Sequence, residues 1–398
     1  MAAASKGRVA IASCHDKVNF GSVLQAWATQ EAVCSLGYEA VTIDKRGLGA
    51  EIGRGRRGYY AGHVLDLGLY RAKLGFVGHR VRQKLDGGFG AKMRQRREAF
   101  AAFERSAFDF TDRTATFAEL GQLVSSYDTV LVGSDQLWLP VNIAGDYFTL
   151  SWVQPPTHKV AYSTSFGVSE LPGKYLRRTG EFLVDFDAVS VREDSGADLV
   201  QAATGRRCCV VCDPTMLLPR QRWEQLAADV TVEPPQEPYL LCYFLGKNIW
   251  NRECAKRLAD ERGLKVVAIA HPDEYVAFDD TYADVYPWKA GPADWVRLVL
   301  GASFVCTDSF HGTVFSSVFE VPFVSFRRHQ GMGAQSTNSR LDTLLGALGQ
   351  PGRICETPGD FDAIATRDID FPSLRSRLQA YRAESLEFLE SALAGEGT

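Results

Sequence analysis

Short apolar runs that favour β-strands alternate with helical patterns along most of this chain. Near the amino terminus the order is "RVAIAS", "SVLQAWATQEAVCSLG" and "EAVTIDK", with Gly37 placed to end the helix. Further buried strands are expected at 128–133, 159–167, 187–193 and 208–214. Strands that alternate with helices build a parallel, doubly wound sheet, so this pattern predicts an α/β fold for the first half of the chain.

A second alternating series begins at Tyr239. Strands are expected in "YLLCYFLG", "LKVVAIA", "FVCTDS" and "PFVSF", and helices at about 249–262, in "DWVRLVLGA" and from about Thr313. A chain of 398 residues also exceeds what one hydrophobic core usually spans. We therefore predict two Rossmann-like parallel-sheet α/β domains that face a cleft, which is where ligands of such folds bind.

The composition along the chain suggests where the domains begin and end. We expect an N-terminal α/β domain over 1–215 and, after a polar, proline-rich linker over 216–238, a C-terminal α/β domain over 239–370. The last segment, 371–398, has apolar residues at helical spacing, and we expect it to form a closing helix that returns to the first domain. An insertion at about 46–100 interrupts the first domain.

This insertion is rich in Lys and Arg between Arg54 and Arg97, with glycines and aromatic residues among them. Two interpretations are open. It is either a solvated, mobile insertion, or a lid or landing site for an anionic acceptor such as a lipid pyrophosphate or a nucleotide.

Charge and cysteine content limit the classes of function. A net charge of -4 predicts no general attraction to nucleic acid. No run is apolar for long enough to form a signal-peptide core or a spanning helix, and the nine scattered cysteines are typical of reduced thiols, so a cytoplasmic protein is expected. The cluster Cys208, Cys209 and Cys212 is better explained as part of a buried strand than as a metal site, and we expect neither a metal nor a cofactor.

Two candidate site segments follow strands of the first domain. Asn19, Gly21 and Ser22 stand where a strand passes into a helix, which is typical of an anion cradle but equally of an ordinary helix cap. Ser134 and Asp135 directly follow the strand expected at 128–133. Asp135 is either a base or hydrogen-bond acceptor for sugar hydroxyls, or a turn cap.

Two further candidates carry a cation. Arg192 ends the strand "DAVSV", where its planar guanidinium would bind carboxylate or phosphate, unless it pairs with a neighbouring acid. In "CTDSFHGTVF", Ser309 and His311 form the turn after a strand, and Gly312 allows a close approach of the backbone. A histidine near a helix N-terminus is held in its neutral, proton-accepting form, so His311 is either a proton carrier or a packed turn residue.

Taken together, these motifs resemble the polysaccharide pyruvyl transferase family. The matching blocks, in chain order, are "NFGSVLQAWATQ", "YDTVLVGSDQLW", "AYSTSFG", "SVREDSG", "DPTMLL", "TDSFHGTVFSSVFEVPFV" and "SRLDTLL". The resemblance implies a GT-B-like fold and transfer of pyruvate from phosphoenolpyruvate to sugar hydroxyls, usually as a ketal. It also implies that His311 lies at the donor and that Arg192 holds the donor's anionic groups.

One position departs from the family pattern. The family has an arginine two residues before the histidine, in R-x-H-G, whereas this chain has Ser309. Phosphoenolpyruvate then lacks one cation, which Arg340, Arg327 or Arg328 would have to supply, unless the donor differs.

The resemblance leads to a hypothesis for the reaction and to two rivals. We expect His311 to shuttle the proton, Asp135 to receive the proton of the acceptor hydroxyl, and Arg192 and Arg340 to bind carboxylate and phosphate. The partners would be phosphoenolpyruvate and a sugar, lipid-linked or small-molecule hydroxyl acceptor. The rivals are a GT-B glycosyltransferase that uses a nucleotide sugar, and a family member with no catalysis.

Overall fold

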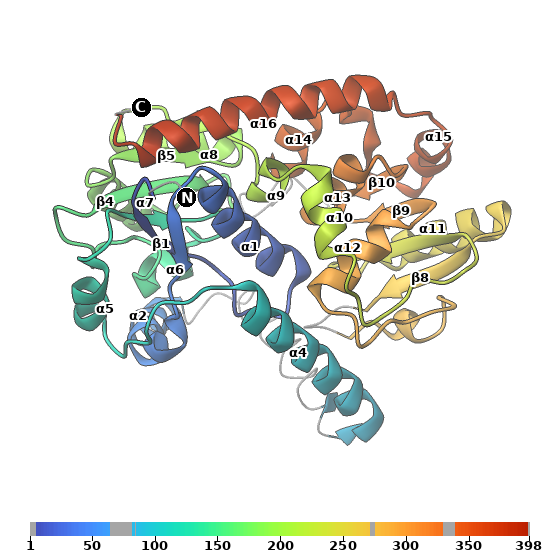
Figure 1. The fold of residues 1–398 in the computed structure, drawn as a ribbon. Helices are drawn as coiled ribbons and strands as arrows, with labels where there is room; N and C mark the ends of the chain where they lie inside the picture. Colours follow the sequence, from blue (N-terminus) through green and yellow to red (C-terminus); the bar gives the residue numbers. More distant parts are fainter. Residues whose placement is uncertain (1–4, 64–81, 84, 271–274, 329–338, 397–398) are drawn as a thin grey trace.

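Two parallel β-sheets lie side by side in the computed structural model, which describes residues 5–63, 82–83, 85–270, 275–328 and 339–396 (Figure 1). Sheet A has the order β2-β1-β3-β4-β5-β6, and sheet B has the order β11-β10-β9-β7-β8. Neighbouring strands in both sheets are paired in parallel. The predicted fold class, two Rossmann-like parallel-sheet domains, is confirmed.

Sheet A contains the strands that the sequence pattern predicted for the first half of the chain. They are β1 (Arg8–Ala12), β2 (Glu39–Thr42), β3 (Thr129–Val132), β4 (His158–Thr164), β5 (Ala188–Val191) and β6 (Cys209–Val210). The strands β1 and β3 are buried almost throughout, because helices cover both faces of the sheet. These helices include α5 (Phe117–Val124), α6 (Pro140–Gly145), α7 (Gly173–Leu183) and α8 (Asp194–Thr204).

Sheet B is built in the same way. Its strands are β7 (Tyr239–Tyr243), β8 (Lys265–Ile269), β9 (Phe304–Thr307), β10 (Phe323–Phe326) and β11 (Ile354–Cys355). Its helices are α11 (Ile249–Arg262), α12 (Pro292–Leu300), α13 (Phe310–Phe319), α14 (Ser339–Ala347) and α15 (Phe361–Ala365), with short 3-10 turns at η2 (Ala277–Asp280), η3 (Pro351–Arg353) and η4 (Pro358–Asp360). The two-residue strand β11 has no counterpart in the predicted pattern.

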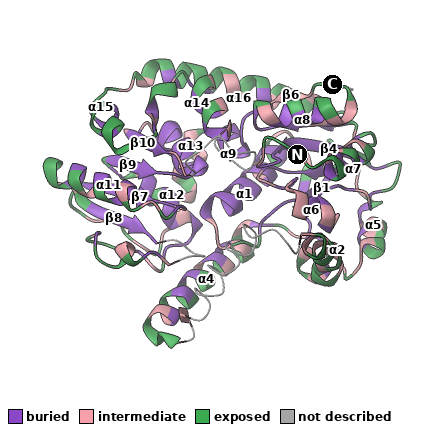
Figure 2. Ribbon diagram, turned by 180° about the vertical axis from the view of Figure 1, so that it is seen from behind, coloured by how far each residue is buried: buried purple, intermediate pink, exposed green. Residues whose placement is uncertain are grey.

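Helix α1 (Phe20–Ser35) lies between the two sheets and is buried along most of its length (Figure 2). The ring of Phe20 stacks on Trp295 of α12 with centroids 5.7 Å apart, and Trp27 packs edge-on against Trp223 at 5.2 Å. One cluster of buried apolar residues therefore includes side chains of both domains. The domains meet through packed aromatic rings, which favours one fixed relative arrangement.

The basic insertion is helical where the structure describes it. After η1 (Lys45–Leu48) come α2 (Gly49–Ala61) and the long helix α4 (Gly87–Ala107), whereas residues 64–81 and Lys84 lie outside the described residues. Arg96 of α4 is 1% exposed and donates hydrogen bonds to the carbonyls of Ala270 and Pro287, at 2.9 and 3.2 Å. This part of the insertion thus connects the first domain to the second (Figure 1).

The connection between the domains and the final helix also pack closely. The segment expected as a polar linker contains α10 (Arg220–Leu226), which follows α9 (Pro214–Leu217), and its Trp223 is fully buried. Helix α16 (Phe371–Leu393) runs across both domains (Figure 1). From α16, Ser385 Oγ accepts a hydrogen bond from the backbone N–H of Cys212 at 2.9 Å, and Arg375 pairs with Glu320 of the second domain.

Candidate functional site

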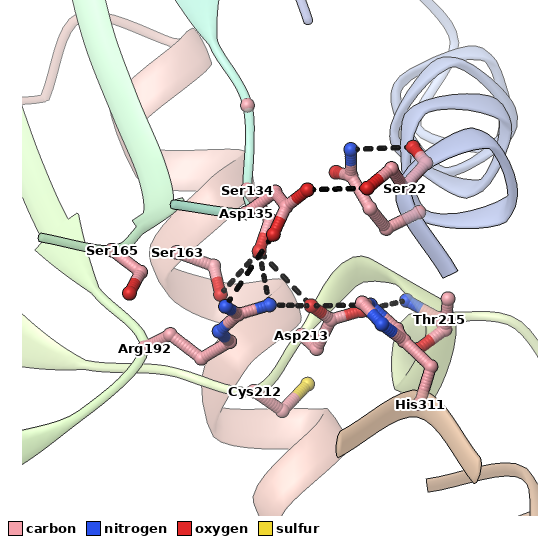
Figure 3. A network of polar contacts seen from close by, with 12 residues as sticks. Ser22, Ser134, Asp135, Ser163, Ser165, Arg192, Cys212, Asp213, Thr215 and His311 are labelled. Atoms are coloured by element: carbon pink, nitrogen blue, oxygen red, sulfur yellow. Dashed lines mark hydrogen bonds and ion pairs between the residues drawn. The ribbon is translucent and has the colours of Figure 1, made fainter. Parts of the chain in front are cut away.

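Polar side chains from both domains form one network at the carboxyl edge of sheet A (Figure 3). Ser134 and Asp135 follow β3, Ser163 belongs to the end of β4, and Arg192 follows β5. Asp135 has φ 82° and Ser163 has φ 54°, values that only a minority of non-glycine residues adopt. Such backbone conformations cluster at functional sites, which agrees with the position of the network between the domains.

The centre of this network is Asp213, a buried carboxylate at the end of the first domain. Its Oδ1 accepts from the backbone N–H and the hydroxyl of Thr215 at 3.0 and 2.7 Å. Its Oδ2 accepts from Arg192 Nη1 at 2.8 Å and from Ser134 Oγ at 3.0 Å, and lies 3.6 Å from His311 Nε2. Burial alone would raise the pKa of Asp213, but His311, Arg192 and Thr215 outweigh it and hold the pKa well below its usual range.

Arg192 is buried among acids but is not fully bonded by them. Asp135 lies 3.9 Å and Glu193 4.0 Å from its guanidinium, and the ring of Phe310 lies 4.5 Å away. Within the described residues, its Nε and Nη2 are buried without a hydrogen-bond partner. Burial lowers the pKa of Arg192, and Asp213, Asp135 and Glu193 raise it overall, so the guanidinium stays charged with two donors unused.

Arg340 adds a second buried cation on the same aromatic ring. Its guanidinium lies 6.0 Å from the centroid of Phe310, and its Nε is buried without a hydrogen-bond partner among the described residues. Burial and the nearby charge of Arg192 lower the pKa of Arg340 to about 9. Two arginines that repel each other in a buried site are stabilised by an anion between them, so this pair is suited to a carboxylate or phosphate.

His311 reaches the network from the second domain. It lies in the first turn of α13, which begins one turn earlier than the sequence pattern suggested, and it is 7% exposed. A Cβ added to Gly21 of α1 would overlap with Nδ1 of the ring, so the absence of a side chain there makes room for the imidazole. The ring is enclosed between α1 and Asp213 rather than standing free at the mouth of a cleft.

Asp135 lies at the outer side of the network and accepts a hydrogen bond from Ser22 Oγ at 2.6 Å. Burial would raise its pKa, but Lys17, Arg192, His311 and Ser22 together hold the pKa of Asp135 well below its usual range. A carboxylate with so low a pKa accepts hydrogen bonds well but takes up a proton poorly. Of the two expected catalytic groups, His311 is therefore better suited to carry a proton.

Three other predicted site residues form local contacts that hold a helix in place. Asn19 caps α1 by accepting from Ser22 N–H at 3.1 Å, and Ser309 caps α13 by accepting from Gly312 N–H at 3.4 Å. Gly312 packs against the side chain of Thr307, with no room for a Cβ. The interpretation of Asn19 as a helix cap is thus observed, whereas Ser309, predicted as a turn residue, is also a cap; both caps direct helix N-termini towards the network.

Sequence reasoning did not select Asp213, Glu193 or Lys17 as site residues. Asp213 had a recognisable signal, because it stands shortly after a strand, β6, just as Asp135 and Arg192 stand after theirs. Lys17 carried none, since it stands in a polar loop, yet Cys14 and Asp135 raise its pKa and keep it cationic beside the network. Glu193 stood next to Arg192 and was considered only as its ion-pair partner.

Neither a metal centre nor a membrane span is found in the part of the chain that the structure describes. No group of three or more His, Cys, Asp or Glu is placed to hold a metal ion there. No helix in those residues is both long and apolar enough to cross a bilayer.

The fold and the network define a two-domain α/β protein whose candidate site lies where the domains meet. Residues 19–330 match the family model described as polysaccharide pyruvyl transferase. The chain belongs to the polysaccharide pyruvyl transferase family, as the sequence motifs indicated, and is therefore a transferase. No curated protein sequence matches it.

Solved structures with a similar fold are distant in sequence. UDP-GlcNAc 2-epimerase of Methanocaldococcus jannaschii, solved with UDP-GlcNAc and UDP, gives a TM-score of 0.49 at 10% identity, over 94% of this chain and 98% of that one. The epimerase of Neisseria meningitidis, bound to UDP-GlcNAc, gives 0.46 at 9% identity, over 96% and 99%. MurG of Acinetobacter baumannii gives 0.45 at 9% identity, over 97% and 99%.

Proposed function

We propose that this protein transfers pyruvate from phosphoenolpyruvate to two hydroxyls of a sugar or glycan-like acceptor, forming a ketal. The observation that carries the proposal is the pair of buried arginines, Arg192 and Arg340, beside one aromatic ring, each with at least one donor that has no partner among the described residues. Phosphoenolpyruvate has a carboxylate and a phosphate, which match two such cations. Membership of the family supports the same donor.

Arg340 is the cation best suited to replace the family arginine that is absent at Ser309. Arg327 is held by Asp342 at 2.7 Å and Glu356 at 3.2 Å. Arg328 donates to the carbonyl of Asp308 at 2.9 Å and lies 3.8 Å from its carboxylate. Arg340 is instead buried near Arg192, where it would complete the clamp on the donor.

The proposed reaction uses His311 as a proton carrier and Asp135 as a carboxylate that stays ionised. One acceptor hydroxyl adds to the central vinyl carbon of the donor while its proton passes through His311 to the methylene carbon. The second hydroxyl then displaces phosphate from the same carbon, and its proton leaves with the phosphate. Asp135 stays ionised and orients the acceptor hydroxyl through a hydrogen bond, a smaller role than that of the base predicted from sequence.

Ligand-induced stabilisation tests the donor. Phosphoenolpyruvate at a hundred times its dissociation constant adds about 2.7 kcal/mol to the free energy of unfolding, so the melting temperature should rise with phosphoenolpyruvate and not with UDP. Arg340→Met should abolish this rise. Arg353→Met, at another buried arginine, whose guanidinium donates to backbone carbonyls, should keep it.

Turnover tests the proton carrier. His311→Gln should keep donor binding and lose on the order of a hundred- to ten-thousand-fold in kcat, because a positioned acid or base contributes about that much. Stabilisation by UDP but not by phosphoenolpyruvate would favour a nucleotide-sugar glycosyltransferase. Binding of phosphoenolpyruvate with no turnover on any glycan or lipid-linked sugar would favour a non-catalytic member.

A further inference from the structure

Asp213 lies between the cation that would hold the donor and the imidazole that would carry the proton (Figure 3). Its Oδ2 accepts from Arg192 Nη1 and faces His311 Nε2, so one carboxylate oxygen serves both groups. Resting on the function proposed above, we propose that Asp213 is the positioning residue that keeps the proton of His311 on Nε2. Nδ1 is then the nitrogen that exchanges a proton with the reactants.

The carboxylate is fixed on every side except the one that faces the imidazole. Thr215 binds its Oδ1 twice, and Ser134 and Arg192 bind its Oδ2. The preceding peptide is also held, because Cys212 N–H donates to Ser385 Oγ and the Cys212 carbonyl accepts from Tyr162 Oη at 3.0 Å. A carboxylate held in this way can orient a neighbouring ring without moving itself.

The imidazole is fixed from the opposite side. Gly21 leaves just enough room for Nδ1, and Nε2 is buried with no hydrogen-bond partner among the described residues. Asp213 Oδ2 lies 3.6 Å from Nε2, which is longer than a hydrogen bond. Nε2 and Oδ2 need to approach by only a few tenths of an ångström to form one.

This arrangement has a chemical consequence for His311. In the neutral ring, an N–H at Nε2 donates to Asp213 and leaves the lone pair on Nδ1 to take the proton of the acceptor hydroxyl. The imidazolium that results is stabilised by the charge of Asp213, and Nδ1 then gives the proton to the donor's methylene carbon. Because Asp213 and Gly21 belong to the first domain and His311 to the second, the proton carrier is complete only when the domains are together.

The ring nitrogens can be observed directly. We expect the 15N spectrum of the neutral His311 side chain to show the proton on Nε2, with the signals assigned by their loss in His311→Gln. A proton on Nδ1 would overturn the proposal. The spectrum requires no substrate, so it identifies the protonated nitrogen of His311 even if phosphoenolpyruvate proves not to be the donor.

Kinetic constants distinguish two roles of Asp213, the positioning of His311 and the anchoring of Arg192 alone. Asp213→Asn removes the charge, and we expect kcat to fall on the order of a hundredfold while KM for phosphoenolpyruvate changes little. A raised KM with unchanged kcat would show that Asp213 only anchors Arg192, and would overturn the proposal. Asp294→Asn is the matched control, because Asp294 is a similarly buried carboxylate bound by the backbone N–H groups of Thr231, Val232 and Gly291 outside the network, so kcat should be retained.

A second variant covers the case in which Asp213→Asn fails to fold. Gly21→Ala keeps the carboxylate but changes the position of the ring relative to it, since the added Cβ would overlap with Nδ1. We expect a comparable loss of kcat and a changed 15N spectrum for His311. Full kcat in a folded Gly21→Ala protein would contradict the proposed contact.

Discussion

Asp135 keeps its charge at the edge of sheet A because Lys17, Arg192, His311 and the hydroxyl of Ser22 lie around it. Burial opposes ionisation, yet Lys17, Arg192, His311 and Ser22 lower the pKa below the ordinary value of 3.8. A carboxyl group whose pKa is lower in the folded protein than in the unfolded chain stabilises the fold above its unfolded pKa. This contribution is lost as the pH falls through the folded value.

The variant Asp135→Asn should therefore show a pH-dependent loss of stability. Asparagine tolerates the positive φ at this position, so the substitution mainly removes the charge. At pH 7 we expect the free energy of unfolding to fall by roughly 1–3 kcal/mol, and the difference from the unmodified protein to shrink as the pH falls below about 4. Urea unfolding at several pH values measures this. A difference that is the same at pH 7 and pH 3 would contradict it.

At the scale of single residues, the position of a side chain after a parallel strand predicted much of the candidate site. The limits of this rule explain which site residues were not predicted. Parallel strands end at one edge, so Asp135 and Arg192 could be expected to meet, and they do lie 3.9 Å apart. The same rule applied to Asp213, but the Asp-Pro sequence after its strand also suits an ordinary turn. The buried state of Arg340 could not be predicted, because it depends on how α14 packs against the first domain.

Helix α13 carries His311, and its position depends on Gly312. A Cβ at Gly312 would overlap with the side chain of Thr307, whose hydroxyl donates to the carbonyl of Tyr243 at 2.6 Å. Gly312→Ala should therefore push α13 away from β9 and lower the free energy of unfolding by roughly 1–3 kcal/mol, as overpacking does. Urea unfolding and kcat measure the two effects.

The matched control lies in α14. A Cβ on Gly346 would meet nothing within 4 Å, so Gly346→Ala should instead raise the free energy of unfolding by about 0.5–1 kcal/mol, because alanine favours the helix. If both substitutions changed the free energy of unfolding in the same direction, close packing of α13 on β9 would not explain the effect of Gly312→Ala.

At the scale of elements, periodicity predicted the strands and α11 well and failed for the insertion. Helix α4 buries Met93, Arg96, Phe100 and Phe103 at helical spacing, but an arginine stands in the middle of this apolar face. With Lys and Arg on the other faces as well, the pattern did not distinguish a solvated segment from a lid or a landing site for an anion. Helix α2 has no fully buried residue, which leaves an even weaker signal.

At the scale of the whole molecule, the sequence predicted two domains but not how closely they are joined. The rings of Phe20, Trp27, Trp223 and Trp295 belong to one core that crosses the boundary, and α16 extends over both sheets (Figure 1). Such contacts are long-range, so local patterns carry little information about them. Because Asp213 and His311 lie on opposite sides of this boundary, every contact that joins the domains also determines the geometry of the site.

Substitution of Arg96 tests whether a contact that joins the domains also affects the candidate site. Burial lowers the pKa of Arg96 to about 10, and its guanidinium lies between the rings of Phe20, 5.6 Å away, and Trp288, 5.3 Å away.

Arg96→Met would leave the carbonyls of Ala270 and Pro287 buried without their donors, which costs roughly 1–3 kcal/mol each. We expect a lower free energy of unfolding in urea and a lower kcat, although no hydrogen bond or ion pair among the described residues joins Arg96 to the network. Arg94→Met, at an exposed position of the same helix, should change the free energy of unfolding by less than about 0.5 kcal/mol. Loss of stability with full kcat in Arg96→Met would show that α4 supports the fold without setting the distance between His311 and Asp213.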